Sequence, residues 1–185
     1  MKKLGFTALL TVILSLAAFA VEVGDAAPLI KASDQNGETW TLSEHLDKGY
    51  LVVYFYPGAM TGGCTKQACA YRDHVAAETE NFQVVGISGD SVESLKWFQK
   101  AENLNFTLLS DSNGAIAKSF GVPVREGEKS IKRTVDGKEV ELKRVATTAR
   151  WTFIIDSAGK VVYRAEKVKP LEDLQGVLGF LSKSK

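Results

Sequence analysis

Two cysteines, Cys64 and Cys69, are the residues whose type and spacing point most directly to chemistry, and they are the only cysteines in the 185-residue chain. An apolar and aromatic run at 51–56 precedes them and predicts a buried strand. Apolar residues at helical spacing follow Cys64 and predict a helix that begins near it. Unpaired backbone N–H groups at a helix N-terminus favour an anion. Because the thiolate is the reactive form of cysteine, this placement indicates a nucleophilic Cys64.

The spacing of the two cysteines leaves a choice between a structural disulfide and a redox pair. On an intact helix, residues five positions apart have Cα atoms about 8–9 Å apart, whereas a disulfide needs about 4.4–6.8 Å. Bridging Cys64 to Cys69 therefore requires the start of the helix to unwind. A bond that closes so short a loop also removes little entropy from the unfolded chain. We therefore favour a redox pair coupled to local unfolding.

The residues before Cys64 resemble the Pro-x3-Thr-x2-Cys signature of the peroxiredoxins, which is met by Pro57, Thr61 and Cys64. The position of Cys69 resembles the Q-type (bacterioferritin-comigratory) branch, in which both redox cysteines lie on one helix. The resemblance implies an α/β, thioredoxin-like fold with a central mixed sheet flanked by helices. It also implies a thiol-dependent peroxidase that reduces hydrogen peroxide and organic hydroperoxides.

The same resemblance implies a role for each site residue. Cys64 is the peroxidatic cysteine, and its sulfenic acid is resolved by Cys69 to an intramolecular disulfide. Arg150, at the start of a predicted strand, is expected to reach the cysteine site and to hold both the sulfur and the peroxide. Thr61 is expected to turn its hydroxyl to the sulfur or the peroxide, and Pro57 to close the loop over the thiol. A dithiol reductant, such as a thioredoxin-like protein, would then reduce the disulfide.

The rest of the chain predicts elements in an order that fits this fold. The strand, helix and strand predicted between 51 and 87 form a parallel βαβ unit. Asp90 is expected to cap the helix that follows. Asp136-Gly137 predicts the turn of an extra charged hairpin near 131–145, which is either a solvated extension or a docking surface for a reductant or a second subunit. An amphipathic helix from about Pro170 to Leu181 closes the chain.

The first 20 residues predict a targeting segment. Lys2 and Lys3 precede an apolar run that ends in Ala18-Phe19-Ala20, which fits a basic n-region, an apolar h-region and a small-x-small cleavage site. An uncleaved membrane anchor is the alternative. Cleavage leaves 21–185 as a single domain, exported to the periplasm or another extracytoplasmic lumen, with contact to the membrane only through this segment.

Composition narrows the remaining function classes. A formal net charge of +1 without long blocks of like charge argues against nucleic-acid binding. Only two histidines, His45 and His74, are present, and neither a metal nor another cofactor is expected. A monomer or weak dimer is expected. The rival functions on the same fold are an exported disulfide oxidoreductase, which normally carries Cys-x2-Cys, and a copper-delivery module, which needs two cysteines three apart and a distant histidine.

Overall fold

The computed structural model describes residues 20–77 and 82–184, so the predicted targeting segment lies outside the described residues except for Ala20. In the part it describes, no helix is both long and apolar enough to cross a membrane. The elements follow one another as β1 (Lys31–Asp34), β2 (Thr39–Thr41), the short 3-10 turns η1 (Leu42–Glu44) and η2 (Leu46–Lys48), β3 (Tyr50–Phe55), α1 (Gly62–Ala76), β4 (Phe82–Ser88), α2 (Val92–Glu102), β5 (Thr107–Ser110), α3 (Ala115–Ser119), β6 (Val124–Val135), β7 (Lys138–Thr148), β8 (Trp151–Ile155), β9 (Val161–Ala165) and α4 (Asp173–Leu181).

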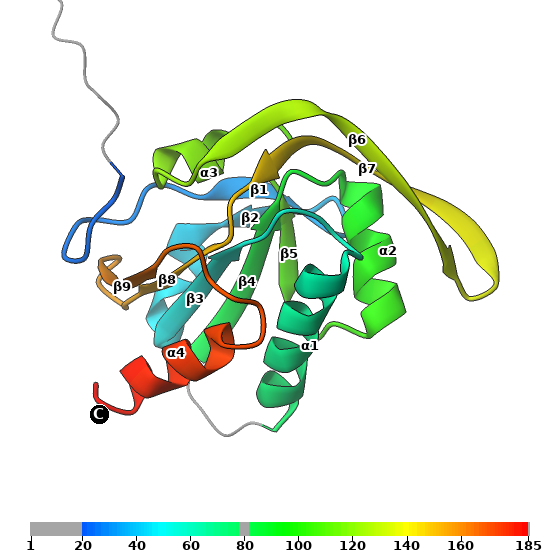
Figure 1. The fold of residues 1–185 in the computed structure, drawn as a ribbon. Coiled ribbons are helices and arrows are strands. Elements are labelled where there is room, and N and C mark those ends of the chain that lie inside the picture. The colour runs from blue at the N-terminus through cyan, green and yellow to red at the C-terminus, as the bar shows by residue number, and fades with distance from the viewer. Residues whose placement is uncertain (1–19, 78–81, 185) are drawn as a thin grey trace, which may run out of the picture.

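A seven-stranded mixed sheet with the order β2-β1-β5-β4-β3-β8-β9 forms the centre of the molecule. β3, β4 and β5 run parallel, and β8 pairs antiparallel with β3 on its other side. The predicted βαβ unit is therefore confirmed, with α1 as its crossover (Figure 1). The α/β fold with a mixed sheet flanked by helices is confirmed as well.

The alternating side chains of β3 serve two cores, because successive residues of a strand point to opposite faces of the sheet. Val52 and Tyr54 pack with α1, α2 and α4 on one face. Val53 and Phe55 pack with α3 on the other face. All four are fully buried, which explains why the strand appears in the sequence as an unbroken apolar run.

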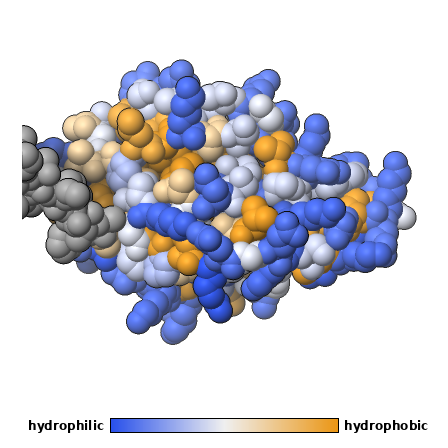
Figure 2. Space-filling view, turned by 90° about the horizontal axis from the view of Figure 1, so that it is seen from above, coloured by the Kyte–Doolittle hydropathy of each residue, from blue (hydrophilic) through white to orange (hydrophobic). Residues whose placement is uncertain are grey.

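The predicted charged hairpin is present as β6 and β7, and its strands are longer than the sequence pattern indicated. Asp136 and Gly137 both have positive φ angles, 50° and 76°, as a type I′ turn requires. The hairpin arches over α2 (Figure 1), and the face of the molecule seen from above is mostly hydrophilic with smaller hydrophobic areas between the polar side chains (Figure 2). Val135, Val140 and Leu142 are nevertheless buried in the α1/α2 core, so one face of the hairpin belongs to the folded body.

α1 begins at Gly62, two residues before Cys64, with Thr61 as its N-cap, so the helix predicted to begin near Cys64 is confirmed. One local prediction differs from the structure. The N-cap of α2 is Ser91, whose hydroxyl accepts a hydrogen bond from the Ser94 N–H, and not Asp90 as predicted. The Asp90 side chain is instead fully buried and turned toward the loop before α1, where it accepts the N–H of Ala59.

Candidate functional site

Cys64 lies in the first turn of α1 and is only 1% exposed. The first α-helical hydrogen bond runs from the Thr65 N–H to the Thr61 carbonyl, so the N–H of Cys64 lies among those that the helix itself leaves unpaired. These N–H groups and the positive end of the helix dipole favour negative charge on the sulfur. The strand-loop-helix placement predicted from the sequence is therefore what the structure contains.

Arg150 supplies the positive charge that faces this sulfur. Its Nη2 donates to Cys64 Sγ over 3.2 Å. Antiparallel pairing sets Trp151, the first residue of β8, opposite Phe55, the last residue of β3. Because Arg150 immediately precedes β8, the sheet brings its guanidinium to the edge from which the cysteine loop leaves. The structure thus brings together the two residues, 86 positions apart, on which the predicted site depends most.

A buried network that the sequence analysis did not identify supports Arg150. Its Nη1 donates to Gln67 Oε1, and the Gln67 amide donates in turn to Asp173 Oδ2. The same Asp173 oxygen accepts the hydroxyls of Tyr71 at 2.8 Å and Thr152 at 3.0 Å. Burial raises the pKa of Asp173, while these donors act in the opposite direction. Gln67 stands one turn after Cys64 and could have been found from helical spacing, whereas no sequence pattern pointed to Asp173.

Thr61 and Pro57 lie in the loop between β3 and α1. The Thr61 hydroxyl donates to the Gly58 carbonyl at 3.0 Å, and not to the sulfur. A threonine three residues after a carbonyl readily makes such a local bond, which leaves its oxygen only as an acceptor toward a ligand. Pro57 is partly exposed at the start of the loop.

The cysteine loop is held from its other side by Asp90 and the hairpin. Asp90 Oδ2 accepts the Ala59 N–H at 2.8 Å, and burial raises the pKa of Asp90. The Arg144 guanidinium lies against Gly58 so closely that a Cβ there would be 2.5 Å from Nη1. Arg133 donates to the Met60 carbonyl at 3.1 Å.

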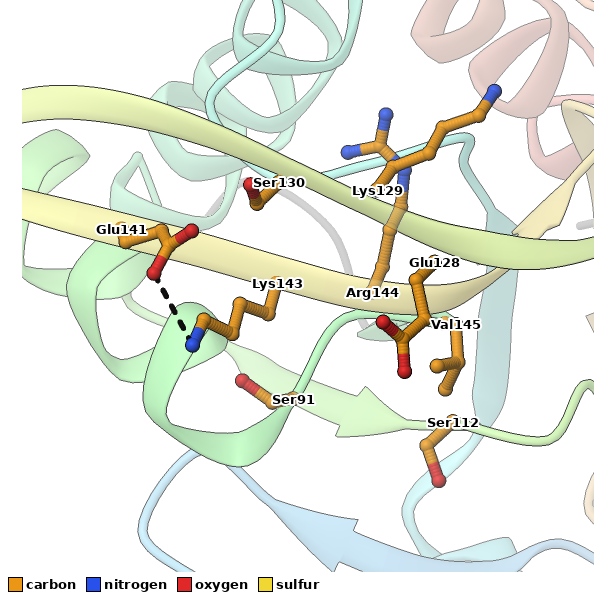
Figure 3. A pocket seen from close by; sticks show the side chains of 10 residues that line it. Ser91, Ser112, Glu128, Lys129, Ser130, Glu141, Lys143, Arg144 and Val145 are labelled. Atoms are coloured by element: carbon orange, nitrogen blue, oxygen red, sulfur yellow. Dashed lines mark ion pairs between the residues drawn. The ribbon is translucent and has the colours of Figure 1, made fainter.

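A pocket of about 610 Å³ lies beside Arg144, between the hairpin and the loops that carry Ser91 and Ser112. Arg144 turns its guanidinium away from these serines (Figure 3). Glu141 and Lys143 form an ion pair at 3.1 Å on the pocket wall. Cys64 is not among the residues that line this pocket, so the pocket is separate from the cysteine site.

Cys69 lies farther along α1, and both cysteines are free. It is half-buried, and its Sγ lies 3.6 Å from Glu102 Oε2 at the end of α2. Burial raises the pKa of the Cys69 thiol, and the nearby Glu102 carboxylate raises it further. α1 is continuous from Gly62 to Ala76, so a bond between the two cysteines requires the helix start to unwind, as the spacing predicted.

The two histidines lie apart from this site. His74 is not simply a solvated helix residue, because its ring stacks on Phe82 with centroids 5.4 Å apart. His45 stacks on Trp40. Among residues 20–77 and 82–184, no group of three or more histidine, cysteine, aspartate or glutamate side chains is placed to hold a metal ion.

Comparisons with known proteins agree on one family. Residues 23–164 match the model of the AhpC/TSA family. Peroxiredoxin Bcp of Escherichia coli K12 is 39% identical over 163 residues, which cover 87% of this chain and 96% of that protein. The crystal structure of peroxidoxin BcpB from Mycobacterium tuberculosis superposes with a TM-score of 0.72 at 33% identity, covering 89% of this chain and 99% of that one. A Xanthomonas campestris bacterioferritin comigratory protein, whose structure is described with its alkyl peroxide reduction activity, gives a TM-score of 0.68 at 27% identity, covering 86% and 99%.

Proposed function

The chain belongs to the AhpC/TSA family, and we propose that Cys64 is the residue with which it reduces peroxides. As a relative of the Bcp and Q-type peroxiredoxins, the protein is a thiol-dependent peroxidase, an oxidoreductase. The observation that carries the residue assignment is the 3.2 Å contact between Arg150 Nη2 and Cys64 Sγ at a helix N-terminus.

In the first step, the Cys64 thiolate attacks one oxygen of the peroxide. The S–O bond forms as the O–O bond breaks, leaving a sulfenic acid on Cys64 and releasing the other oxygen as water or an alcohol after it takes a proton. Negative charge spreads from sulfur onto both oxygens in the transition state. The fixed guanidinium of Arg150 stabilises this charge best at that moment, with Gln67 and Asp173 holding it in place.

In the second step, Cys69 condenses with the sulfenic acid to give a disulfide and water. The helix start must unwind for this, and three features make unwinding inexpensive. Gly62 and Gly63 are poor helix formers, and the N-cap Thr61 makes no capping bond with its side chain. An external dithiol of the thioredoxin-like kind then reduces the disulfide by exchange.

Location and assembly are further parts of the proposal. The basic and apolar N-terminal pattern with its small-x-small site supports export, with residues 21–185 as one peroxidase domain and the segment before them as signal or anchor. In such a compartment the reductant is an exported dithiol protein. We propose a monomer or weak dimer. The alternative of an exported disulfide oxidoreductase or copper-delivery module is not favoured, because the relatives of this chain are peroxiredoxins.

Single-turnover peroxide consumption by the reduced protein tests these roles. Wild type should consume one equivalent of hydrogen peroxide and lose two hydrogens by intact mass. Cys64→Ser should consume none. Cys69→Ser should consume one equivalent and stop as a sulfenic acid that dimedone traps. Rapid consumption by Cys64→Ser, or tight copper binding with peroxide left intact, would contradict the proposal.

A further inference from the structure

The Cys69 thiol has a polar neighbour that the two steps above do not use. Its Sγ lies 3.6 Å from Glu102 Oε2, within hydrogen-bonding distance for sulfur. In the part of the chain that the structure describes, this is the only side-chain hydrogen bond of that thiol. The two groups come from different helices, because Cys69 lies on α1 and Glu102 is the last residue of α2.

The position of Glu102 is unfavourable for the stability of its own helix. The C-terminal end of a helix carries partial negative charge, so a carboxylate there is repelled. α2 ends at Glu102 with Asn103 in the left-handed conformation, at φ 50° and ψ 44°. A side chain that conflicts with local electrostatics and contacts a reactive atom points to a functional role.

The contact between Cys69 and Glu102 lies on the anchored part of α1. The Arg72 guanidinium donates to the Glu102 carbonyl, and the Asn105 amide donates to the Arg72 carbonyl at 3.1 Å. The first bond joins the second half of α1 to the end of α2, and the second joins it to the loop that follows α2. Unwinding of the first turn therefore moves Cys64, while Cys69 and Glu102 stay together.

We propose that Glu102 is the general base of the resolving step, an inference that rests on the proposed roles of Cys64 and Cys69. The Cys69 sulfur attacks the sulfenic sulfur of Cys64, and the S–S bond forms as the S–OH bond breaks. The Glu102 carboxylate takes the thiol proton and passes it to the departing hydroxide. The products are a disulfide and water, and Glu102 is again a carboxylate. No further oxidant or reductant is needed.

The charged groups that face Cys69 permit a decisive test. They are Arg72 and Asp73 on α1 and Glu102 on α2. Burial and Glu102 raise the pKa of the Cys69 thiol, so little thiolate is present at neutral pH and an attack by the thiol needs a proton acceptor. If Glu102 acted only by its charge, removing it would give more thiolate and faster resolution. If Glu102 is a general base, removing it should instead slow disulfide formation.

The experiment compares wild type, Glu102→Gln and the control Asp73→Asn in rapid-quench single turnovers from pH 6 to pH 8. Glutamine keeps the shape of Glu102 and an oxygen that accepts the thiol hydrogen bond, but it is not a base. Asp73→Asn removes a charge near Cys69 that is 68% exposed and paired with Arg72. Dimedone traps the sulfenic acid, and mass spectrometry separates that species from the disulfide at each time.

Sulfenic acid should form at the same rate in all three proteins. Disulfide formation at pH 7 should slow about tenfold in Glu102→Gln, less than the usual general-base effect of about 10²–10⁴-fold, because Cys69 is partly open to water that can also accept the proton. In that variant the rate should climb steeply with pH, because only thiolate formed by the solvent reacts. Asp73→Asn should be as fast as wild type or slightly faster. Disulfide formation in Glu102→Gln at or above the wild-type rate would overturn the proposal, whereas absence of sulfenic acid in wild type would overturn the proposed function itself.

Discussion

Cys64 and Cys69 share one helix, yet the structure surrounds them differently. Cys64 is 1% exposed, and its sulfur lies at the N-terminal end of α1 with the Arg150 guanidinium 3.2 Å away. Cys69 is half-buried, and its sulfur faces the C-terminal end of α2 with the Glu102 carboxylate 3.6 Å away. A positive surrounding favours thiolate and a negative one favours thiol. The comparison teaches that the two cysteines differ in the charge and in the helix end that face their sulfurs, and that this difference fits a peroxidatic role for Cys64 and a resolving role for Cys69.

The two ends of α1 also differ in how firmly they are held. The first turn contains Gly62 and Gly63 and lacks a side-chain cap. In the later part, Arg72 is hydrogen-bonded to Glu102 at the end of α2 and to Asn105 in the loop that follows it. A helix with one weak and one anchored end unwinds from the weak end, which is the movement that a bond between the cysteines requires.

The largest expected effect concerns the positive charge at Cys64. Arg150→Met should slow sulfenic acid formation by about 10²–10³-fold, the usual loss when one preorganised donor to a developing charge is removed. Stopped-flow peroxide consumption measures it. Arg164→Met is the matched control, because Arg164 lies over the Trp151 ring at 4.8 Å and makes no contact with the sulfur. If the rate of sulfenic acid formation fell less than tenfold in Arg150→Met, the positive charge beside Cys64 would not explain how its role differs from that of Cys69.

Asp173→Asn tests whether Asp173, acting through Gln67, holds the Arg150 guanidinium in place. Asparagine keeps an oxygen for Gln67, Tyr71 and Thr152 but loses the negative charge that strengthens their hydrogen bonds. Hydrogen bonds to charged groups exceed neutral ones by about 1 kcal/mol, so sulfenic acid formation should slow about five- to tenfold. Disulfide formation in the second step should be unchanged. Equal slowing of both steps would indicate general loss of structure, which circular dichroism would detect.

Gly62→Ala tests the weak end of the helix. A Cβ at Gly62 meets no atom within 4 Å, so the change stabilises the helix start without contact. An alanine in place of a glycine gains about 0.8–1.0 kcal/mol in a helix interior and less at the first position, so disulfide formation should slow by up to about four- to fivefold while sulfenic acid forms normally. Unchanged disulfide formation would mean that unwinding does not limit the second step.

Gly63→Ala is the contrasting variant. Its Cβ would lie 3.1 Å from Pro170 Cγ and 3.5 Å from Arg150 Nη2. The same gain in helix propensity is therefore combined with crowding at the peroxide site. We expect Gly63→Ala to slow both sulfenic acid formation and disulfide formation. Comparing the rates of each step in Gly62→Ala and Gly63→Ala then separates the effect of helix stability from the effect of crowding at the peroxide site.

The smallest expected effect is a shift in the titration of Cys69. In Cys64→Ser, alkylation by iodoacetamide follows the Cys69 thiolate, and its midpoint should lie above the ordinary thiol pKa because burial and Glu102 raise it. Adding Glu102→Gln should lower this pKa and speed alkylation at pH 7. The same substitution should slow disulfide formation. If Glu102→Gln changed the alkylation rate and the rate of disulfide formation in the same direction, the contrast between the two cysteines would not hold.

Sequence reasoning was most successful where the structure is local. The apolar run at 51–56, the Gly-rich loop and the helical spacing after Cys64 are short-range signals, and each predicted the element that the structure contains. The turn at Asp136-Gly137 followed from its residues as well. The position of Arg150 opposite Cys64 came from the family resemblance rather than from any local pattern.

It failed where a polar side chain had a choice of partners. Asp90 has the sequence context of a helix cap, but the buried N–H of Ala59 takes its carboxylate and Ser91 becomes the cap. The Thr61 hydroxyl, expected to turn to the sulfur or the peroxide, donates to the Gly58 carbonyl, and its role toward a peroxide stays a prediction. A local pattern names the groups that can form a hydrogen bond, while the competition between acceptors is decided by packing.

By itself, the sequence determined that a strand passes into a helix at a cysteine, and that a second thiol follows at a spacing an intact helix cannot bridge. Only the tertiary structure decided which charges face the two sulfurs. Arg150 reaches α1 from the residue before β8, Asp173 from α4 and Glu102 from α2, across 33 to 106 residues of chain. Electrostatic and hydrogen-bond energies depend on separations of a few ångströms in space, and separation along the chain does not encode them.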